Sequence, residues 1–276
     1  MKIYFCADDF GLSPESDGHI KECKVNKISV LANSDADLSG LNAKVSTHIN
    51  FVEGKCVSDK NLIPLLVDEN GYFKHTFGGL LKLSLGKTGK AFRQQVKTEM
   101  RAQINKVNAP EMIDSHQHVH MIPAIFSCLC EIIKEDGLQT EYLRIPAEPV
   151  LPYISAPELY KSYLSLNFIK QQTLKFLNLF NKSKLKSMGL KQNDFFGIMF
   201  SGNMNEKRVN RLLNAFVMHA ERKNRDLEVL FHPGFVETAE GKNAMKEYKF
   251  STFYLADGRK KEFLAAKNIA KDEKCR

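Results

Sequence analysis

Two adjacent carboxylates, Asp8 and Asp9, follow an apolar run at residues 3–7. The carboxyl end of a parallel strand is where α/β barrels place their active sites, and carboxylates there can bind a metal ion or accept a proton. Side chains alternate faces along a strand, so both can reach one site only if the chain leaves regular β geometry, which Gly11 permits. The alternative is an Asx turn in which both carboxylates accept hydrogen bonds only from backbone amides.

A histidine-rich segment follows the apolar residues 112–113. If strand geometry continued, four metal-binding or proton-transferring side chains would share one face: Asp114, His116, His118 and His120. Packing explains such a set poorly. At about 3.3 Å of rise per residue, His116 and His120 would lie about 13 Å apart, too far to share one ion. His116, closest to the strand, is therefore the better ligand, and His118 and His120 are left with structural or supporting roles.

Single histidines stand at two more predicted strands. His48 lies in the run 45–51, and His232 follows the run 227–230 and precedes a Pro-Gly turn. Aspartate and histidine ligands from three strand ends would leave coordination positions open for water and substrate, as a hydrolytic metal requires. Oxygen and nitrogen donors suit Zn²⁺ and other divalent ions, so the ion is not identified. His232 suits the protonation of a leaving amine. Taken alone, His48 also fits a core histidine and His232 a turn residue.

Elements that bring distant strand ends together are needed to position these residues. Apolar runs of strand length alternate with longer helix-like stretches, which indicates βα units and a parallel sheet. We expect strands at residues 3–7, 28–32, 45–51, 112–116, 142–146, 195–200 and 227–232. We expect helices at residues 14–24, 92–107, 124–134, 206–222 and 260–270. The pattern predicts an α/β fold, a TIM-like barrel of about seven strands.

Two segments interrupt the alternation. Residues 53–90 carry Asn-Gly and Gly-Gly turn signals and are expected to form a long loop excursion of the kind that builds lids and binding walls. Residues 157–187 are rich in Leu, Phe and Lys and are expected to form a helical insertion. Several apolar positions of this insertion fit packing better than a membrane or partner surface: Leu174, Phe176, Leu177, Leu179 and Phe180.

Length and composition restrict the class of protein. A chain of 276 residues that is 43% hydrophobic suffices for one large core, so we expect a single domain over residues 1–276. Apolar stretches fall short of a membrane span and the start lacks a signal-peptide pattern, so we expect a cytoplasmic protein without a membrane partner. The net charge of +8 falls largely on lysines expected on solvated helix faces, including residues 182–191 and 259–274, which argues against a nucleic-acid partner. A homodimer is left open.

The ordered motifs resemble those of the YdjC-like carbohydrate deacetylases, the family that includes chitooligosaccharide deacetylase. Residues 7–13, Ala-Asp-Asp-Phe-Gly-Leu-Ser, are similar to the opening motif of the family, and residues 114–123 are similar to its histidine-rich motif. The segments 47–55, 68–71, 143–148 and 232–235 extend the resemblance over most of the chain. Ser46 and Thr47 depart from the residues that usually precede the histidine at position 48, and residues 157–187 show no clear match.

The resemblance implies one divalent ion, Mg²⁺ or Zn²⁺, held by Asp9, His48 and His116. It also implies that Asp8 is the catalytic base and that His232 is the acid. Apart from the resemblance, the remaining candidates would bind substrate or support the ligands: Asp114, His118, His120, Arg144 and Glu148. Arg144 could orient a carboxylate or bind substrate, and an ordinary ion pair fits it equally. The implied activity is hydrolysis of the N-acetyl group of an amino sugar or a short N-acetylglucosamine-type oligosaccharide, with release of acetate.

Two other functions stay open at this point. A metal-independent glycoside hydrolase would need two carboxylic acids flanking the bond, which Asp8 with Asp114 or Glu148 could supply. A non-catalytic sugar-binding protein on the same scaffold is the other, because a fold alone does not fix a function.

Overall fold

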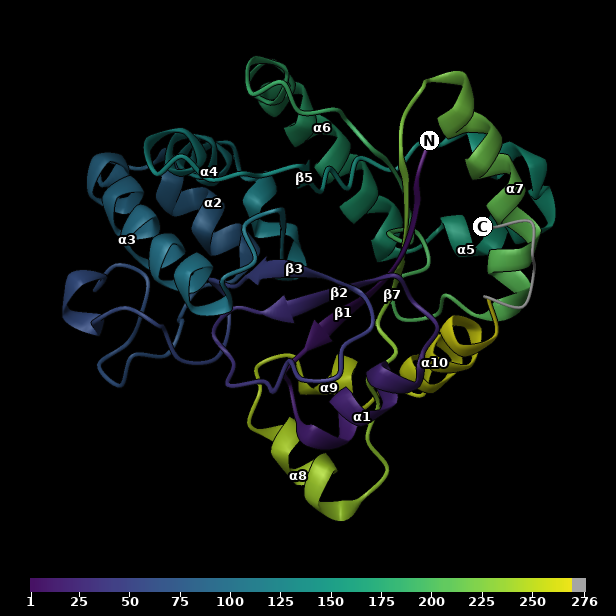
Figure 1. Cartoon of the computed structure of the whole chain (residues 1–276), viewed down its shortest axis with the longest axis horizontal. Helices are drawn as coiled ribbons and strands as arrows, with labels where there is room; N and C mark the ends of the chain where they lie inside the picture. The colour runs from purple at the N-terminus through teal and green to yellow at the C-terminus, as the bar shows by residue number, and fades with distance from the viewer. Residues whose placement is uncertain (270–276) are drawn as a thin grey trace.

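The computed structural model describes residues 1–269, apart from the side chain of Ser162. Its centre is a sheet of seven parallel strands in the order β5-β4-β3-β2-β1-β7-β6 (Figure 1). The strands are β1 (Ile3–Phe10), β2 (Lys27–Leu31), β3 (Lys44–Ile49), β4 (Met112–Ser115), β5 (Tyr142–Leu143), β6 (Asp194–Phe196) and β7 (Leu227–Phe231). Every residue of β2 and of β7 is buried, as expected for strands covered on both faces.

The expected strands are all present, but those toward the edges of the sheet are shorter than predicted. The run 195–200 forms a strand only as far as Phe196, because the chain turns at Gly197, where φ is +141°. A side chain at Gly197 would place its Cβ 2.8 Å from the Cβ of Leu230 on β7. Glycine therefore allows the chain to turn away from the sheet in close contact with the neighbouring strand.

The helices include all those predicted within the described residues. They are α1 (Pro14–Glu22), α2 (Phe77–Leu85), α3 (Gly89–Val107), α4 (Pro123–Glu135), α5 (Tyr160–Tyr163), α6 (Leu166–Ser187), α7 (Glu206–Arg222), α8 (Ala239–Lys246), α9 (Ser251–Tyr254) and α10 (Gly258–Asn268). Residues 1–269 also contain short 3-10 helices: η1 (Lys60–Leu62), η2 (His116–Met121), η3 (Leu151–Ser155) and η4 (Pro157–Leu159). The last residue of the helix predicted at 260–270, Ala270, lies outside the described residues.

Two apolar clusters join the helices to the sheet. One contains α3 and α4 with β3 and β4, and the other contains α7 and α10 with β1, β2 and β7. Figure 1 shows α2, α3 and α4 on the left of the sheet and α7 and α10 on the right. The fold is thus α/β, a curled half-barrel consistent with a distorted TIM-like barrel, and this prediction is confirmed.

The two interrupting segments have different structures. Residues 53–90 contain η1, α2 and two isolated antiparallel bridges, whereas residues 157–187 are mostly helical, with η4, α5 and α6. That the chain is a single domain stays a prediction. Within residues 1–269, no helix is long and apolar enough to cross a membrane.

Candidate metal centre and active site

The end of β1 directs two consecutive carboxylates into one cavity. The register with β2 shifts between Ala7 and Phe10, and Asp9 takes a φ of +67°. This departure from β geometry cancels the alternation of faces, so Asp8 and Asp9 both line a cavity of about 720 Å³. The chain therefore leaves regular β geometry at Asp9, which is what allows both carboxylates to reach one site.

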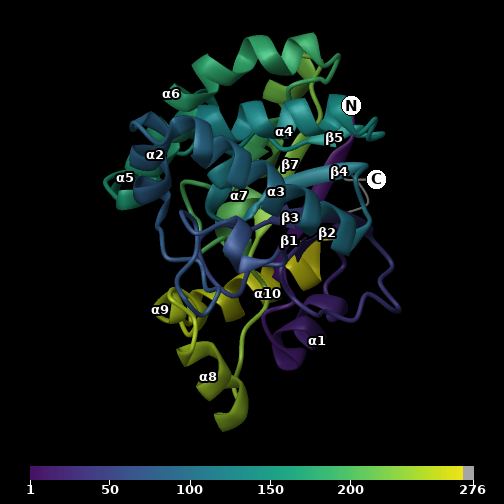
Figure 2. The same ribbon diagram turned by 90° about the vertical axis from the view of Figure 1, so that its left-hand side faces the viewer.

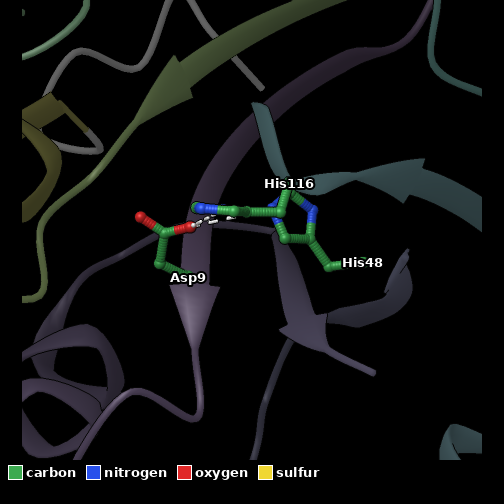
Figure 3. Close-up of side chains that lie close together, drawn as sticks. All are labelled: Asp9, His48 and His116. Carbon is green, nitrogen blue, oxygen red and sulfur yellow. Dashed lines mark hydrogen bonds and ion pairs between the residues drawn. The ribbon is translucent and has the colours of Figure 1, made fainter. Parts of the chain in front are cut away.

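The Asp9 carboxylate meets two imidazole rings inside this cavity (Figure 3). Asp9 Oδ1 lies 2.9 Å from Nδ1 of His116 and 3.7 Å from Nε2 of His48. One donor atom from each residue lies within 4.8 Å of the others, and all three side chains are buried. Ligand atoms around an ion with bonds of about 2 Å stand about 3–4 Å apart, so this spacing fits one divalent ion.

Each of these three residues has its remaining polar atom engaged by a buried partner. His48 Nδ1 donates to Oδ1 of Asp114 at 2.5 Å, which leaves Nε2 facing the cavity. His116 Nε2 lies 3.0 Å from Oε1 of Glu53. A carboxylate on the second nitrogen of a histidine is the usual support of a metal ligand, because it fixes ring orientation and tautomer.

The third member of the cluster, Asp9, has the same kind of support. Its Oδ2 accepts a hydrogen bond from Nη2 of Arg259, a fully buried residue of α10. The Arg259 guanidinium also donates to the carbonyl oxygen of Gly234 at 2.9 Å. Oδ1 of Asp9 is therefore the oxygen that faces the two histidines.

The pKa shifts of the three residues indicate that the cluster stabilises bound positive charge. Burial lowers the pKa of His116, but Asp9 and Glu53 outweigh burial and raise that pKa to about 10. Burial likewise opposes a charged His48, yet Asp8 and Asp114 raise its pKa above the ordinary value. The pKa of Asp9 is held well below its usual range by His116 and Arg259, despite burial. A cation bound there would replace these protons.

A buried charge network lies next to the cluster. Arg144 contacts both Asp8 and Glu228, and Lys27 donates to Asp114 Oδ2 at 2.7 Å. Burial raises the pKa of Asp8, but the Arg144 guanidinium and then His48 lower this pKa by a larger amount. The net shift is downward, and the carboxylate is ionised at neutral pH. Arg144 thus holds the Asp8 carboxylate in place through hydrogen bonds to both of its oxygens.

Strand geometry does not continue through the histidine-rich segment, so its four side chains do not share one face. β4 ends at Ser115, and Gln117 and His118 adopt φ values of 50° and 58°. This left-handed turn places His118 in the cavity lining, while His120 lies outside it, with Nε2 donating to the carbonyl oxygen of Arg144 at 2.8 Å. Burial lowers the pKa of His118 well below its ordinary value, and its Nδ1 has no hydrogen-bond partner in the described chain.

The other candidates divide between the cavity and its surroundings. His232 lines the cavity, and Oε2 of Glu262 accepts its backbone N–H and lies 3.4 Å from its Nδ1. Asp114 is fully buried and supports His48 without lining the cavity. Glu148 is also outside the lining: its carboxylate accepts the backbone N–H groups of residues 197–199 and so holds the turn after β6.

Four further residues of the site were not predicted as site residues from the sequence, and only Glu53 lies in one of the motif segments. Glu53 and Tyr254 lie beside His116, and the Tyr254 hydroxyl donates to Glu53. Lys170 of α6 lines the cavity. Arg259 was expected on a solvated helix face, and this expectation was wrong, because its guanidinium is buried against Asp9. Arg259 is 250 positions from Asp9, so no spacing rule connects them.

The sequence of this chain matches a known protein family and several named relatives. The family model described as YdjC-like protein matches residues 2–268. A carbohydrate deacetylase of Danio rerio is 27% identical over 168 residues, which cover 55% of this chain and 52% of that protein. A carbohydrate deacetylase of Clostridium beijerinckii is 26% identical over 190 residues, covering 63% of this chain and 74% of that protein. This chain thus spans about half the length of the vertebrate relatives that it matches.

A solved structure has a similar fold. A protein of Enterococcus faecalis V583, provisionally described as a cellobiose-phosphate cleavage protein, superimposes with a TM-score of 0.65 at 16% identity. The match covers 99% of this chain and 92% of the other. Because the family model spans nearly the whole sequence, the chain belongs to the YdjC-like protein family.

Proposed function

We propose that this protein is a carbohydrate deacetylase that removes the N-acetyl group of an amino sugar or a short N-acetylglucosamine-type oligosaccharide and releases acetate. The family membership and the names of the relatives support this activity. One structural observation carries the proposal. Asp9, His48 and His116 each turn one donor atom toward a common point, and each has its other polar atom engaged by a buried partner.

The donor set fits a divalent metal ion. Two imidazole nitrogens and one carboxylate oxygen from separate strands suit Zn²⁺, and Mg²⁺ is the other ion that we consider. When bound, such an ion polarises the amide carbonyl and lowers the pKa of water from about 15.7 toward about 7. Asp9, His48 and His116 would hold it.

Asp8 is the proposed base. Its Oδ2 lies 3.9 Å from Nε2 of His48, so the carboxylate borders the same point as the three proposed ligands. Arg144 keeps it ionised, and an ionised carboxylate can accept the proton of the attacking water. The water oxygen then forms its bond to the carbonyl carbon of the acetyl group.

His232 is the proposed acid. An amide nitrogen leaves poorly unless it is protonated, and His232 lines the same cavity as Asp8. Proton donation from His232 to the nitrogen accompanies cleavage of the carbon–nitrogen bond. The products are acetate and the free amine of the sugar, with the water atoms divided between them.

The glycoside hydrolase alternative loses its second carboxylic acid. Asp114 accepts hydrogen bonds from Lys27, Ser29 and Ser46 and is fully buried. Glu148 is occupied by backbone amides, and neither residue lines the cavity with Asp8. A glycosidase needs both carboxyl groups at the bond that is cleaved, so this geometry favours the deacetylase.

The ligand assignment is tested by Asp9→Asn and His48→Ala. Both variants should lose the bound metal, measured by elemental analysis, and release no acetate from an N-acetylglucosamine oligomer. The matched control is Asp35→Asn, because Asp35 has a highly exposed side chain away from the cavity and should keep both properties. Full metal content in either test variant would refute the ligand set, and metal retention with sugar binding but no turnover in the wild type would identify a non-catalytic protein.

A further inference from the structure

The outer side of α6 exposes a series of large apolar side chains. They are Leu166, Phe168, Ile169, Phe176, Leu179 and Phe180, with exposed fractions from 39% to 83%. We call these six residues the α6 apolar face. The expectation that this helix packs is confirmed for Leu174 and Leu177 and is wrong for the last three members of the face.

The opposite side of α6 packs against the rest of the protein. Leu174, Leu177 and Leu185 are buried in the core, and Asn181 donates to the carbonyl oxygen of Met121 at 2.9 Å. Figure 2 shows α6 along the top of the molecule with α4, against which it packs, beneath it. A surface helix normally carries polar residues on its outer side, so a second apolar face requires a partner.

The charge of α6 restricts what that partner is. The helix contains five lysines and no acidic residue: Lys170, Lys175, Lys182, Lys184 and Lys186. Lys182 and Lys186 are exposed and form no ion pair within residues 1–269. An apolar face bordered by unpaired lysines is the pattern of a helix that lies in the plane of a membrane surface.

We propose that the α6 apolar face docks on an anionic lipid bilayer. The aromatic and aliphatic side chains would enter the boundary between headgroups and acyl chains, and the lysines would meet the lipid phosphates. The helix would lie on the membrane without crossing it, in agreement with the absence of a spanning helix among residues 1–269. This proposal does not depend on the deacetylase activity.

A second copy of the chain fits this surface less well. In a two-fold symmetric contact the same patch meets itself, so the lysines of one α6 would approach those of the other. Like charges placed across an interface weaken it, and α6 offers no carboxylate to compensate. An anionic surface instead complements the charge of the helix.

The α6 apolar face also reaches the mouth of the cavity. Leu166 and Ile169 are both exposed members of the face and residues of the cavity lining, together with Asn167 and Lys170 from the same helix turns. Docking through α6 would therefore hold the opening of the cavity close to the bilayer surface.

Vesicle sedimentation tests the proposal on the full chain. Wild-type protein should sediment with vesicles of phosphatidylglycerol and phosphatidylcholine but not with vesicles of phosphatidylcholine alone. The combined substitutions Phe176→Ser, Leu179→Ser and Phe180→Ser should weaken this binding at least about tenfold. Lys182→Gln with Lys186→Gln should weaken it to a similar extent, since each lysine near an anionic surface contributes about fivefold.

The control variant carries Leu85→Ser and Met218→Ser, two exposed apolar residues on α2 and α7, and should bind vesicles as the wild type does. Circular dichroism and thermal melting establish that each variant is folded, as expected for substitutions at exposed positions. Failure of the folded wild type to bind anionic vesicles would overturn the proposal. So would a wild-type dimer in analytical ultracentrifugation that the triple substitution dissociates, if no vesicle binding accompanies it.

Discussion

Arg144 donates two parallel hydrogen bonds to Asp8, from Nη1 to Oδ2 and from Nη2 to Oδ1, each 2.7 Å long. The two residues are 136 positions apart and almost completely buried. A bidentate pair fixes the plane of the carboxylate as well as its charge. Arg144 also donates to Glu228, so one guanidinium joins the proposed base to the charge network beneath the cavity.

The substitution Arg144→Met should destabilise the protein by about 3–5 kcal/mol, because it leaves buried carboxylates without their partner. Urea denaturation measures this free energy of unfolding. The control is Arg211→Met, which removes an exposed pair with Glu158 and should change stability by at most about 1 kcal/mol. Equal losses in the two variants would show that the buried pair has no special energetic role.

The Glu53→Gln variant should bind the metal about 10–100-fold more weakly, because Glu53 supports the outer nitrogen of His116. Titration with Zn²⁺ or Mg²⁺ against a chelating competitor measures the affinity. Glu69→Gln, an exposed carboxylate of the same excursion, is the control and should bind metal as the wild type does. An unchanged affinity in Glu53→Gln would remove Glu53 from the support of the metal centre.

His232→Ala should lower the rate of amide hydrolysis about 10²–10⁴-fold while the bound metal is retained. The loss should be much smaller with an activated acetyl ester, whose leaving group needs no proton. Steady-state kinetics with both substrates measures the difference. Equal losses on the amide and on the ester would contradict the role of His232 as an acid.

Glu148 should make stability depend on pH. Burial raises the pKa of the Glu148 carboxyl to about 7 from a reference value of 4.5. The folded state therefore binds the carboxyl proton more tightly than the unfolded state does. Its contribution is fully present below pH 4.5 and is lost as the pH rises through about 7, a change of about 3 kcal/mol. Urea denaturation between pH 4.5 and 8 should show this decline in the wild type and a smaller one in Glu148→Gln. Parallel curves would contradict the assignment.

The fold was predictable from sequence because its signals are local. Near-continuous apolar runs mark buried parallel strands, and each predicted run contains one. The ends of strands were less predictable, since they depend on contacts made after folding. The turn at Gly197 follows from a close approach to Leu230, and the left-handed conformations of Gln117 and His118 have no marker in their residue types.

The site was predictable where its residues stand at strand ends. Asp8, Asp9, His48 and His116 were expected to meet because the carboxyl ends of parallel strands share one edge, and all four line the same cavity. Their chemical roles remain predictions. Arg259 could not be foreseen, because it comes from a helix far along the chain and its charge resembles that of its exposed neighbours.

Acetate release from an N-acetylglucosamine oligomer, measured with and without a chelator, tests whether this protein is a metal-dependent deacetylase. We expect that the purified protein releases acetate, that removal of the metal abolishes this activity, and that added Zn²⁺ or Mg²⁺ restores it. Acetate release that persists in the metal-free protein, or release of reducing sugar without acetate, would contradict the proposed function.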